Sequence, residues 1–399
     1  MKKRGCRSAL TTAFLFLVCV ALALGVVWQR QKSFADAPVG GLKPDSSVVV
    51  ERGDSFRTVL GKLRGAGVAV GSDIEWQALA RLTGAAGKVQ VGEYALRPGI
   101  TPRQLLLDMR DGKVVSYRVT LVDGWTFRDL RRALARAPNL KQDTAKMSDA
   151  EVMKALGHEG QHPEGRFLPE TYQYNRTDSD LGVLKRAYAG MEKALDEAWK
   201  GRDADLPYKD PYELLTMASI VEKETGVPDE RAQVAGVFVR RLKTGMRLET
   251  DPTIIYGLGD AYQGNITWAH LRTDGPYNSR TRDGLPPTPI AMPGLASLKA
   301  SAHPAPGDAL FFVAVGDGSG RSRFAATYPE HQRNVAAYLA NRRADAGRVD
   351  PNEPLRGTVT ISEDGAPVSV SDAVPSDATP TPAPSSTTPP APSSTPQSR

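Results

Sequence analysis

The chain has 399 residues, 40% of them apolar, which is enough for one or two globular cores. Its net charge of +6 is not gathered in basic runs interleaved with aromatic residues, which argues against nucleic-acid binding. Its cysteines, Cys6 and Cys19, precede residue 45 and cannot staple a later domain, and its five histidines are scattered. We therefore expect no metal site and no cofactor.

A basic segment, residues 1–8, precedes an uncharged stretch at 9–28 that is long enough to cross a hydrocarbon core of roughly 30 Å. We predict a transmembrane anchor at 9–28, with 1–8 in the cytoplasm and the rest exported. A cleaved signal peptide is the alternative, because Ala35-Asp36-Ala37 resembles a cleavage site. The apolar stretch is longer than a usual signal-peptide core of about 7–15 residues, which favours a retained anchor.

Residues 29–45 read as a linker, and 46–118 as a small subdomain. Its apolar spacing predicts a strand at 48–51, helices near 56–63 and 73–82, and a strand at 89–96. This order resembles a LysM-type glycan-binding module, although a βααβ domain without any glycan role gives the same pattern. A short helix at 101–109 follows.

Residues 119–345 mix helices and strands, so we expect an α+β fold. We expect Asp251-Pro252 and 284–287 to shape loops. The tail, 346–399, is rich in Pro, Ser and Thr beyond Ser371 and is expected to be mostly disordered, apart from a hairpin at 358–370. The other predicted elements are strands at 119–122 and 309–315 and helices after Thr126, at 181–199, 211–225 and 230–242, and from the end of 328–331 to about 343.

Two glutamates, Glu222 and Glu224, end the mostly apolar helical stretch 214–221. The negative end of the helix dipole and apolar neighbours both disfavour a carboxylate there and raise its pKa. A general acid that cleaves a glycosidic bond needs such a shift. Solvated helix-end charges are the alternative. Residues at i and i+2 point about 200° apart on a helix, and the apolar periodicity does not choose between the two.

The stretch 218–226 resembles the signature of the YceG-like family, whose members are endolytic murein transglycosylases. Further segments match in order and spacing over about residues 46–342. They are 164–172, 237–242, 245–257, 277–279, 284–287, 290–291, 293–294, 297–300 and 303–304.

The resemblance implies a lysozyme-like catalytic domain with one essential glutamate and a peptidoglycan substrate. Lytic transglycosylases of other families carry a helix-end Glu-Ser pair, which Glu224-Thr225 resembles more closely than Glu222-Lys223 does. The catalytic role is therefore carried over to Glu224, with Thr225 orienting its carboxyl and Glu222 in support. The product would be a 1,6-anhydro-N-acetylmuramic acid end.

For the substrate groove we expect five residues from the matched motifs, because aromatic rings stack on sugar faces and amides pair with hydroxyls. The alternatives are that Asn278 is a turn residue and Tyr256 a core residue. The five are Tyr277, Asn278, Tyr256, Thr253 and Glu170.

The sequence departs from the family pattern at two positions. Arg280 stands where an aromatic residue is expected, and Ser322 where a histidine is common. The family implies a single-pass inner-membrane protein with a periplasmic catalytic domain, acting on new glycan strands beside penicillin-binding proteins. A hydrolytic muramidase and a non-catalytic peptidoglycan-binding scaffold are the alternative functions.

Overall fold

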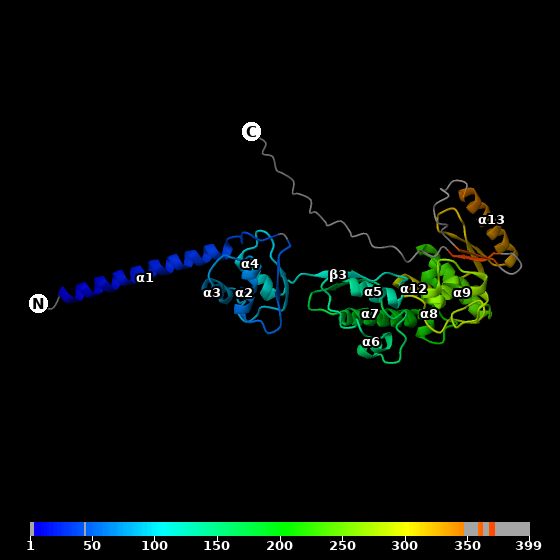
Figure 1. The fold of residues 1–399 in the computed structure, drawn as a ribbon, viewed down its shortest axis with the longest axis horizontal. Coiled ribbons are helices and arrows are strands. Elements are labelled where there is room, and N and C mark those ends of the chain that lie inside the picture. Colours follow the sequence, from blue (N-terminus) through cyan, green and yellow to red (C-terminus); the bar gives the residue numbers. More distant parts are fainter. Residues whose placement is uncertain (1–3, 44, 347–357, 362–366, 372–399) are drawn as a thin grey trace, which may run out of the picture.

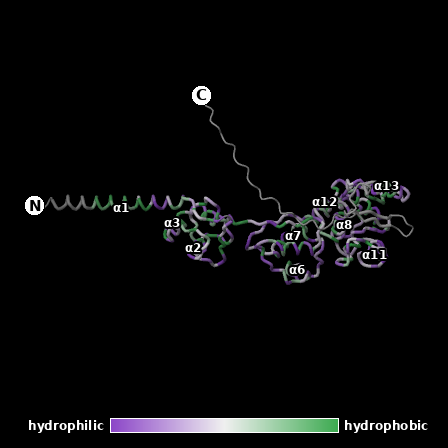
Figure 2. Tube along the Cα trace, turned by 45° about the horizontal axis from the view of Figure 1, so that its top comes forward, coloured by the Kyte–Doolittle hydropathy of each residue, from purple (hydrophilic) through white to green (hydrophobic). Residues whose placement is uncertain are grey.

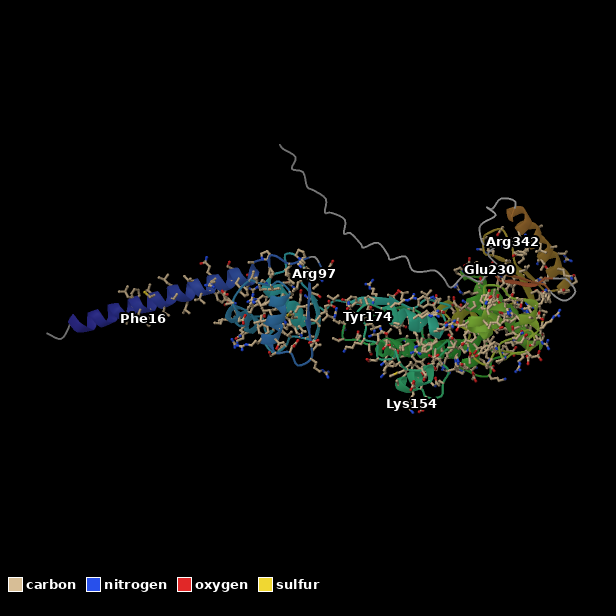
Figure 3. All side chains as sticks on the ribbon, in the orientation of Figure 1. Phe16, Arg97, Lys154, Tyr174, Glu230 and Arg342 are labelled. Atoms are coloured by element: carbon tan, nitrogen blue, oxygen red, sulfur yellow. The ribbon has the colours of Figure 1, made fainter. Side chains whose placement is uncertain are left out.

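The computed structural model describes residues 4–43, 45–346, 358–361 and 367–371, arranged as a long helix, a small subdomain and a larger body in a row (Figure 1). The helix is α1 (Arg4–Asp36), and its segment Ala13–Asp36 is long and apolar enough to cross a membrane. Its large apolar side chains between Phe14 and Trp28 are exposed. Much of the free part of this helix is coloured hydrophobic in Figure 2, and Phe16 lies on it with no other part of the chain beside it (Figure 3).

The end of α1 packs into the small subdomain. Ala35 is buried, and the Phe34 ring meets Trp76 edge-on at 5.4 Å between centroids. Asp36 forms a 2.7 Å ion pair with Arg103. The helix therefore continues past the boundary predicted at residue 28, and the first part of the expected linker 29–45 is helical and joined to a folded core.

The small subdomain has the predicted order of strand, two helices and strand, followed by a third helix. Its two strands pair antiparallel, with Val48 opposite Tyr94. Serine and threonine side chains cap each of the three helices, because a hydroxyl oxygen accepts from an otherwise unbonded N–H of the first turn. The elements are β1 (Ser47–Val50), α2 (Phe56–Gly65), α3 (Asp73–Leu82), β2 (Gly92–Ala95) and α4 (Pro102–Asp111).

The first half of the body is built around a two-stranded antiparallel sheet, and its first strand starts two residues earlier than the predicted 119–122. Phe127 stacks on Phe167 at 5.0 Å, and Tyr188 packs edge-on against Phe167 in the same core. The elements are β3 (Tyr117–Thr120), α5 (Phe127–Arg136), α6 (Asp149–Leu156), β4 (Thr171–Tyr174) and α7 (Asp180–Gly201).

The second half is helical, and α8 lies at its centre, packed against α7, α9 and α12. Asp251 and Pro252 begin α10 and do not form the expected loop, because a proline in the first turn has no N–H that the helix would need to bond. The elements are α8 (Pro211–Glu224), the 3-10 turn η1 (Pro228–Glu230), α9 (Arg231–Lys243), α10 (Asp251–Leu258), the 3-10 turn η2 (Gly259–Ala261), α11 (Trp268–Arg272) and α12 (Leu295–Ala302).

The C-terminal elements add two antiparallel hairpins and a helix. The hairpin predicted within 358–370 is confirmed, whereas most of the tail predicted to be disordered lies outside the described residues. Ser322, which replaces the common histidine, donates its backbone N–H to the buried Glu230 carboxylate at 3.1 Å. The elements are β5 (Phe311–Ala314), β6 (Ser322–Ala325), α13 (Tyr328–Ala346), β7 (Thr358–Ile361) and β8 (Pro367–Ser371). The predicted α+β class is confirmed.

The core of the small subdomain gives a first prediction. Leu79 on α3 is fully buried, whereas Ile74 on the same helix is 79% exposed. We expect Leu79→Ala to lower the free energy of unfolding by about 3 kcal/mol, because it leaves a cavity, and Ile74→Ala to change it by less than about 0.5 kcal/mol. Urea unfolding followed by tryptophan fluorescence, to which Trp76 contributes, measures both. Equal effects would show that this face of α3 does not form the core.

Candidate functional site

The site is built on helix α8, which is buried on all sides from Leu214 to Val221. Asp210 caps the start of the helix by accepting the Glu213 N–H at 2.9 Å, and Pro211 occupies the first turn. The helix ends at Glu224 because Thr225 takes an extended conformation, with φ −141° and ψ 130°. An apolar, fully packed helix thus carries a carboxyl group at its negative end.

The Glu224 carboxyl is held largely away from water but remains partly accessible. Burial raises its pKa from 4.5 to about 7. A hydrogen bond from the Thr250 hydroxyl to Oε1 and the positive charges of Arg241 and Arg280 oppose that rise, and the Asp251 carboxylate adds to it. At neutral pH a substantial fraction of this group is therefore protonated, as a general acid requires.

Thr250 is fixed by a small network of hydroxyl groups. Ser279 Oγ accepts the Thr250 N–H at 2.9 Å, and Thr253 Oγ1 donates to the Thr250 carbonyl at 2.8 Å. The Ser279 and Thr253 hydroxyls also bond to each other at 2.9 Å, and all three residues are buried. The hydroxyl that meets Glu224 therefore has little freedom to move.

Glu222 has a different environment from Glu224. Its Oε2 accepts the N–H of Gly294, the residue that caps the start of α12, at 3.0 Å. Its Oε1 lies 3.6 Å from Arg231 Nη2, and the side chain is 7% exposed. These contacts join α8 to α9 and α12, so Glu222 supports the packing around the site.

Thr225 does not make the contact expected of it. Its Oγ1 accepts the Val227 N–H at 3.0 Å and so fixes the turn after α8. The hydroxyl that orients Glu224 belongs to Thr250, which is 26 residues further along the chain. Thr250 and Ser279 were not among the residues expected from the sequence, although both lie inside the matched motifs.

Two of the five expected groove residues form an aromatic wall. Tyr256 and Tyr277 are partly exposed, and their rings meet edge-to-face at 5.0 Å between centroids. The Tyr277 hydroxyl shares a 2.9 Å hydrogen bond with Thr288. Such a pair offers the flat apolar surface on which a sugar ring stacks.

The other three groove residues lie differently. Thr253 is buried behind Thr250. Asn278 is also buried, and its amide N–H groups point to the carbonyls of His270, Leu271 and Thr273, at 2.8 Å for Thr273. Both therefore shape the site from behind. Glu170 is exposed next to β4.

Glu164 is a further carboxyl that the sequence reasoning did not single out. It is 4% exposed, and it accepts the Phe127 N–H at the start of α5 and the Tyr256 hydroxyl, both at 3.0 Å. Burial raises its pKa to about 7, and the bond from Tyr256 opposes the rise. Its placement ties the aromatic wall to the first half of the body. The signal was present in the sequence, as an acid set among Pro163, Gly165 and Phe167 in a matched motif.

Within the described ranges, no group of three or more His, Cys, Asp or Glu side chains is arranged to hold a metal ion.

An endolytic murein transglycosylase of Bacillus subtilis (strain 168) is 28% identical over 338 residues, which are 80% of this chain and 92% of that protein. A protein of the same name from Streptococcus pneumoniae serotype 2 is 29% identical over 248 residues, 61% of this chain and 42% of that longer protein. A crystal structure of a YceG-like protein from Listeria monocytogenes matches with a TM-score of 0.46 at 26% identity, covering 73% of this chain and 99% of that one.

The model of the YceG-like family matches residues 48–337, which include the small subdomain from the second residue of β1 onward and every site residue described above. This match extends over well more than half of the chain. The protein therefore belongs to the YceG-like family.

Proposed function

We propose that this protein is an endolytic murein transglycosylase, with Glu224 as its acid and base. The observation that carries the proposal is a carboxyl with a pKa near 7 at the end of a buried helix, oriented by the Thr250 hydroxyl. The aromatic wall stands on the same two segments that fix Thr250, with Tyr256 on α10 and Tyr277 two residues before Ser279. The curated relatives that carry this name, and the family to which the chain belongs, supply the substrate class.

The proposed reaction needs only this one carboxyl. Protonated Glu224 donates to the glycosidic oxygen as that oxygen leaves C1 of N-acetylmuramic acid. The resulting carboxylate takes the proton of the C6 hydroxyl of the same sugar, whose oxygen bonds to C1 and closes the 1,6-anhydro ring. This proton from the C6 hydroxyl replaces the one that Glu224 donated, so the enzyme is restored. No second carboxylate is required because the nucleophile is part of the same sugar.

Ordinary glycosidases use a second carboxylate to act on water or on the sugar. Glu164 is unsuited to that role because both of its oxygens are bonded, to the Phe127 N–H and the Tyr256 hydroxyl. The Asp251 carboxylate, which acts on Glu224, is paired with Arg280 at 3.0 Å, so neither carboxyl is free to act as that second group, which fits the transglycosylase reaction. In this proposal the helical half of the body serves as the lysozyme-like catalytic part, with Tyr256 and Tyr277 as sugar contacts.

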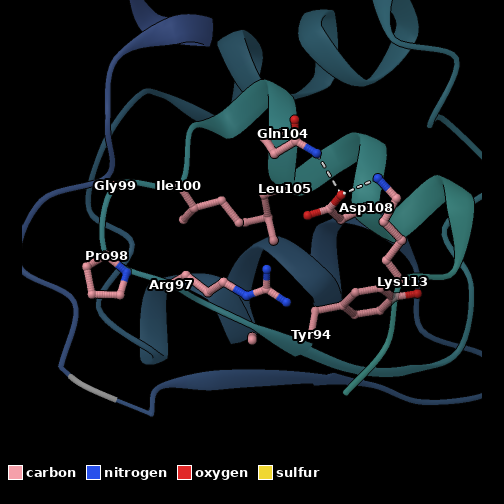
Figure 4. Close-up of a pocket in the computed structure, with 10 residues that line it drawn as sticks. Tyr94, Arg97, Pro98, Gly99, Ile100, Gln104, Leu105, Asp108 and Lys113 are labelled. Carbon is pink, nitrogen blue, oxygen red and sulfur yellow. Dashed lines mark hydrogen bonds and ion pairs between the residues drawn. The ribbon is translucent and has the colours of Figure 1, made fainter. Parts of the chain in front are cut away.

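The small subdomain carries a pocket of about 390 Å³, remote in sequence from Glu224 (Figure 4). In it the Asp108 carboxylate accepts from Gln104 Nε2 at 2.7 Å and from Lys113 Nζ at 3.1 Å, while Arg97 extends toward Tyr94. Such groups pair readily with sugar hydroxyls. As a LysM-like module, this subdomain would hold the glycan strand here without cutting it.

The long helix α1 supports a membrane-anchored location. Its free segment is apolar, and the basic residues before it favour a cytoplasmic N-terminus, which would place the catalytic body in the periplasm. Because α1 runs directly into the small subdomain, the site would stay close to the membrane surface where new strands emerge. Contact with penicillin-binding proteins stays a prediction.

Digestion of purified sacculi tests the function. Wild-type protein is expected to release fragments with 1,6-anhydro ends, detected by mass spectrometry. Glu224→Gln is expected to slow release by about 10²–10⁴-fold, because the proton donor is lost. Glu222→Gln is the matched control and is expected to retain cleavage. Reducing ends would show hydrolysis, and absence of release by wild type would favour a scaffold.

The raised pKa of Glu224 also predicts a pH-dependent stability. A carboxyl whose folded pKa of about 7 exceeds its unfolded value of 4.5 binds protons more tightly in the folded state, so stability falls as pH rises between those values. The free energy of unfolding of Glu224→Gln does not fall in this way. Relative to that of wild type, it should therefore rise by on the order of 2 kcal/mol between pH 4.5 and pH 7. Urea unfolding at pH 5 and pH 8 measures the gain. A stability difference that does not change with pH would contradict the assignment.

A further inference from the structure

Arg280, where the resemblance led us to expect an aromatic residue, is built into the site. Its side chain is 11% exposed, and Nη2 lies 3.0 Å from Oδ1 of Asp251, whose side chain is 1% exposed. Asp251 directly follows Thr250, and Arg280 directly follows Ser279, the residue that fixes Thr250. The ion pair therefore spans the same two segments that orient the Glu224 carboxyl.

The charges that act on Glu224 come from three parts of the chain. Arg241 projects from α9, is buried, and is fixed by bonds from Nε to the Leu310 carbonyl and from Nη1 to the Leu248 carbonyl, both at 2.7 Å. Asp251 belongs to α10, and Arg280 to the segment after Tyr277. Glu249 lies on the segment just before α10, and its negative charge favours the protonated form of Arg241.

The remaining helices around α8 bring no further buried charge to this carboxyl. The buried residues of α12 are Ser, Leu and Ala. The one buried acid of α7 is Asp180, at the first turn, where it accepts from Thr144. Glu222 and Lys223, on α8 itself, are engaged with Gly294 and with the Gly124 carbonyl.

Counting formal charges shows what Arg280 does. With Glu224 protonated, the two arginines, 241 and 280, balance the two carboxylates of Asp251 and Glu249. Once Glu224 has given up its proton, the group carries one net negative charge. Without Arg280 it would carry two in a poorly solvated place, where charge separation is costly.

We propose that Arg280, held by Asp251, is a positioning residue that stabilises the carboxylate which Glu224 becomes after donating its proton. The proposal rests on the function proposed above. It stands on the Arg280–Asp251 ion pair and on the bonds by which the residues next to this pair, Ser279 and Thr250, reach the Glu224 carboxyl. The positive charge of Arg280 also lowers the pKa of Glu224.

The pH dependence of cleavage by the full-length protein in detergent tests this role. Removing the cation by Arg280→Met should lower kcat and move the high-pH limb of the profile upward by about 0.5–1 pH unit, because the carboxylate form of Glu224 loses its partner. Asp251→Asn should move the limb downward. Arg280→Lys keeps the charge and should stay near wild type, and the double variant Arg280→Met/Asp251→Asn should return toward it.

Opposite shifts in the two single variants support the proposal, since damage to the fold alone would not move the limb in both directions. Coincident limbs for wild type and Arg280→Met, or shifts in the same direction, would overturn it. If wild type releases no fragments, the proposed function fails instead. The role of Arg280 is then decided by the free energy of unfolding measured against pH, with each protein compared with its own Glu224→Gln variant. In Arg280→Met the pH range over which this free energy falls should extend to higher pH than in wild type. An unchanged range would overturn the proposal.

Discussion

The arrangement of this protein depends on one carboxyl kept from full contact with water. Glu224 ends a helix that is buried on every side, and its charged form is disfavoured there because neither water nor a close cation fully replaces its lost solvation. One hydroxyl, that of Thr250, bonds it. The groups around Thr250 limit its motion, so the direction of the acid is set by contacts far from α8 in sequence.

Carboxyl groups of similar chemistry serve different purposes within this body. Glu222 accepts a backbone N–H at the start of α12, and Glu164, in the loop after α6, accepts one at the start of α5, so each carboxylate binds the positive end of a helix dipole. Glu164 also binds the Tyr256 hydroxyl and thus places the aromatic wall. Of these three carboxyls, Glu224 is the one that combines a raised pKa with a position at the negative end of its helix.

Local sequence features predict the helix and the proton affinity of its end, because apolar flanks and helix termini are properties of neighbouring residues. They could not separate Glu222 from Glu224, since what distinguishes these two are the contacts with Gly294 and Thr250, which lie 72 and 26 residues away. Nearness in sequence also favoured Thr225 as the orienting hydroxyl, but an extended backbone turns it toward Val227.

The groove shows the same limit. A tyrosine in a motif predicts an aromatic ring available to a sugar, and the rings of Tyr256 and Tyr277 do pack against each other, while their contact with a sugar stays a prediction. An asparagine in the same motif is equally suited to a sugar hydroxyl or to backbone carbonyls, and the burial of Asn278 by α11 decided for the carbonyls. Asp251-Pro252 suggested a loop, yet the pair starts α10, because proline and an acid both suit a first helical turn.

The protonation state of Glu224 in the resting protein is the central claim, and infrared difference spectroscopy between wild type and Glu224→Gln measures it directly. The account predicts a protonated-carboxyl band at pH 6 that gives way to a carboxylate band as pH rises through about 7. A carboxylate band already complete at pH 6 would contradict it.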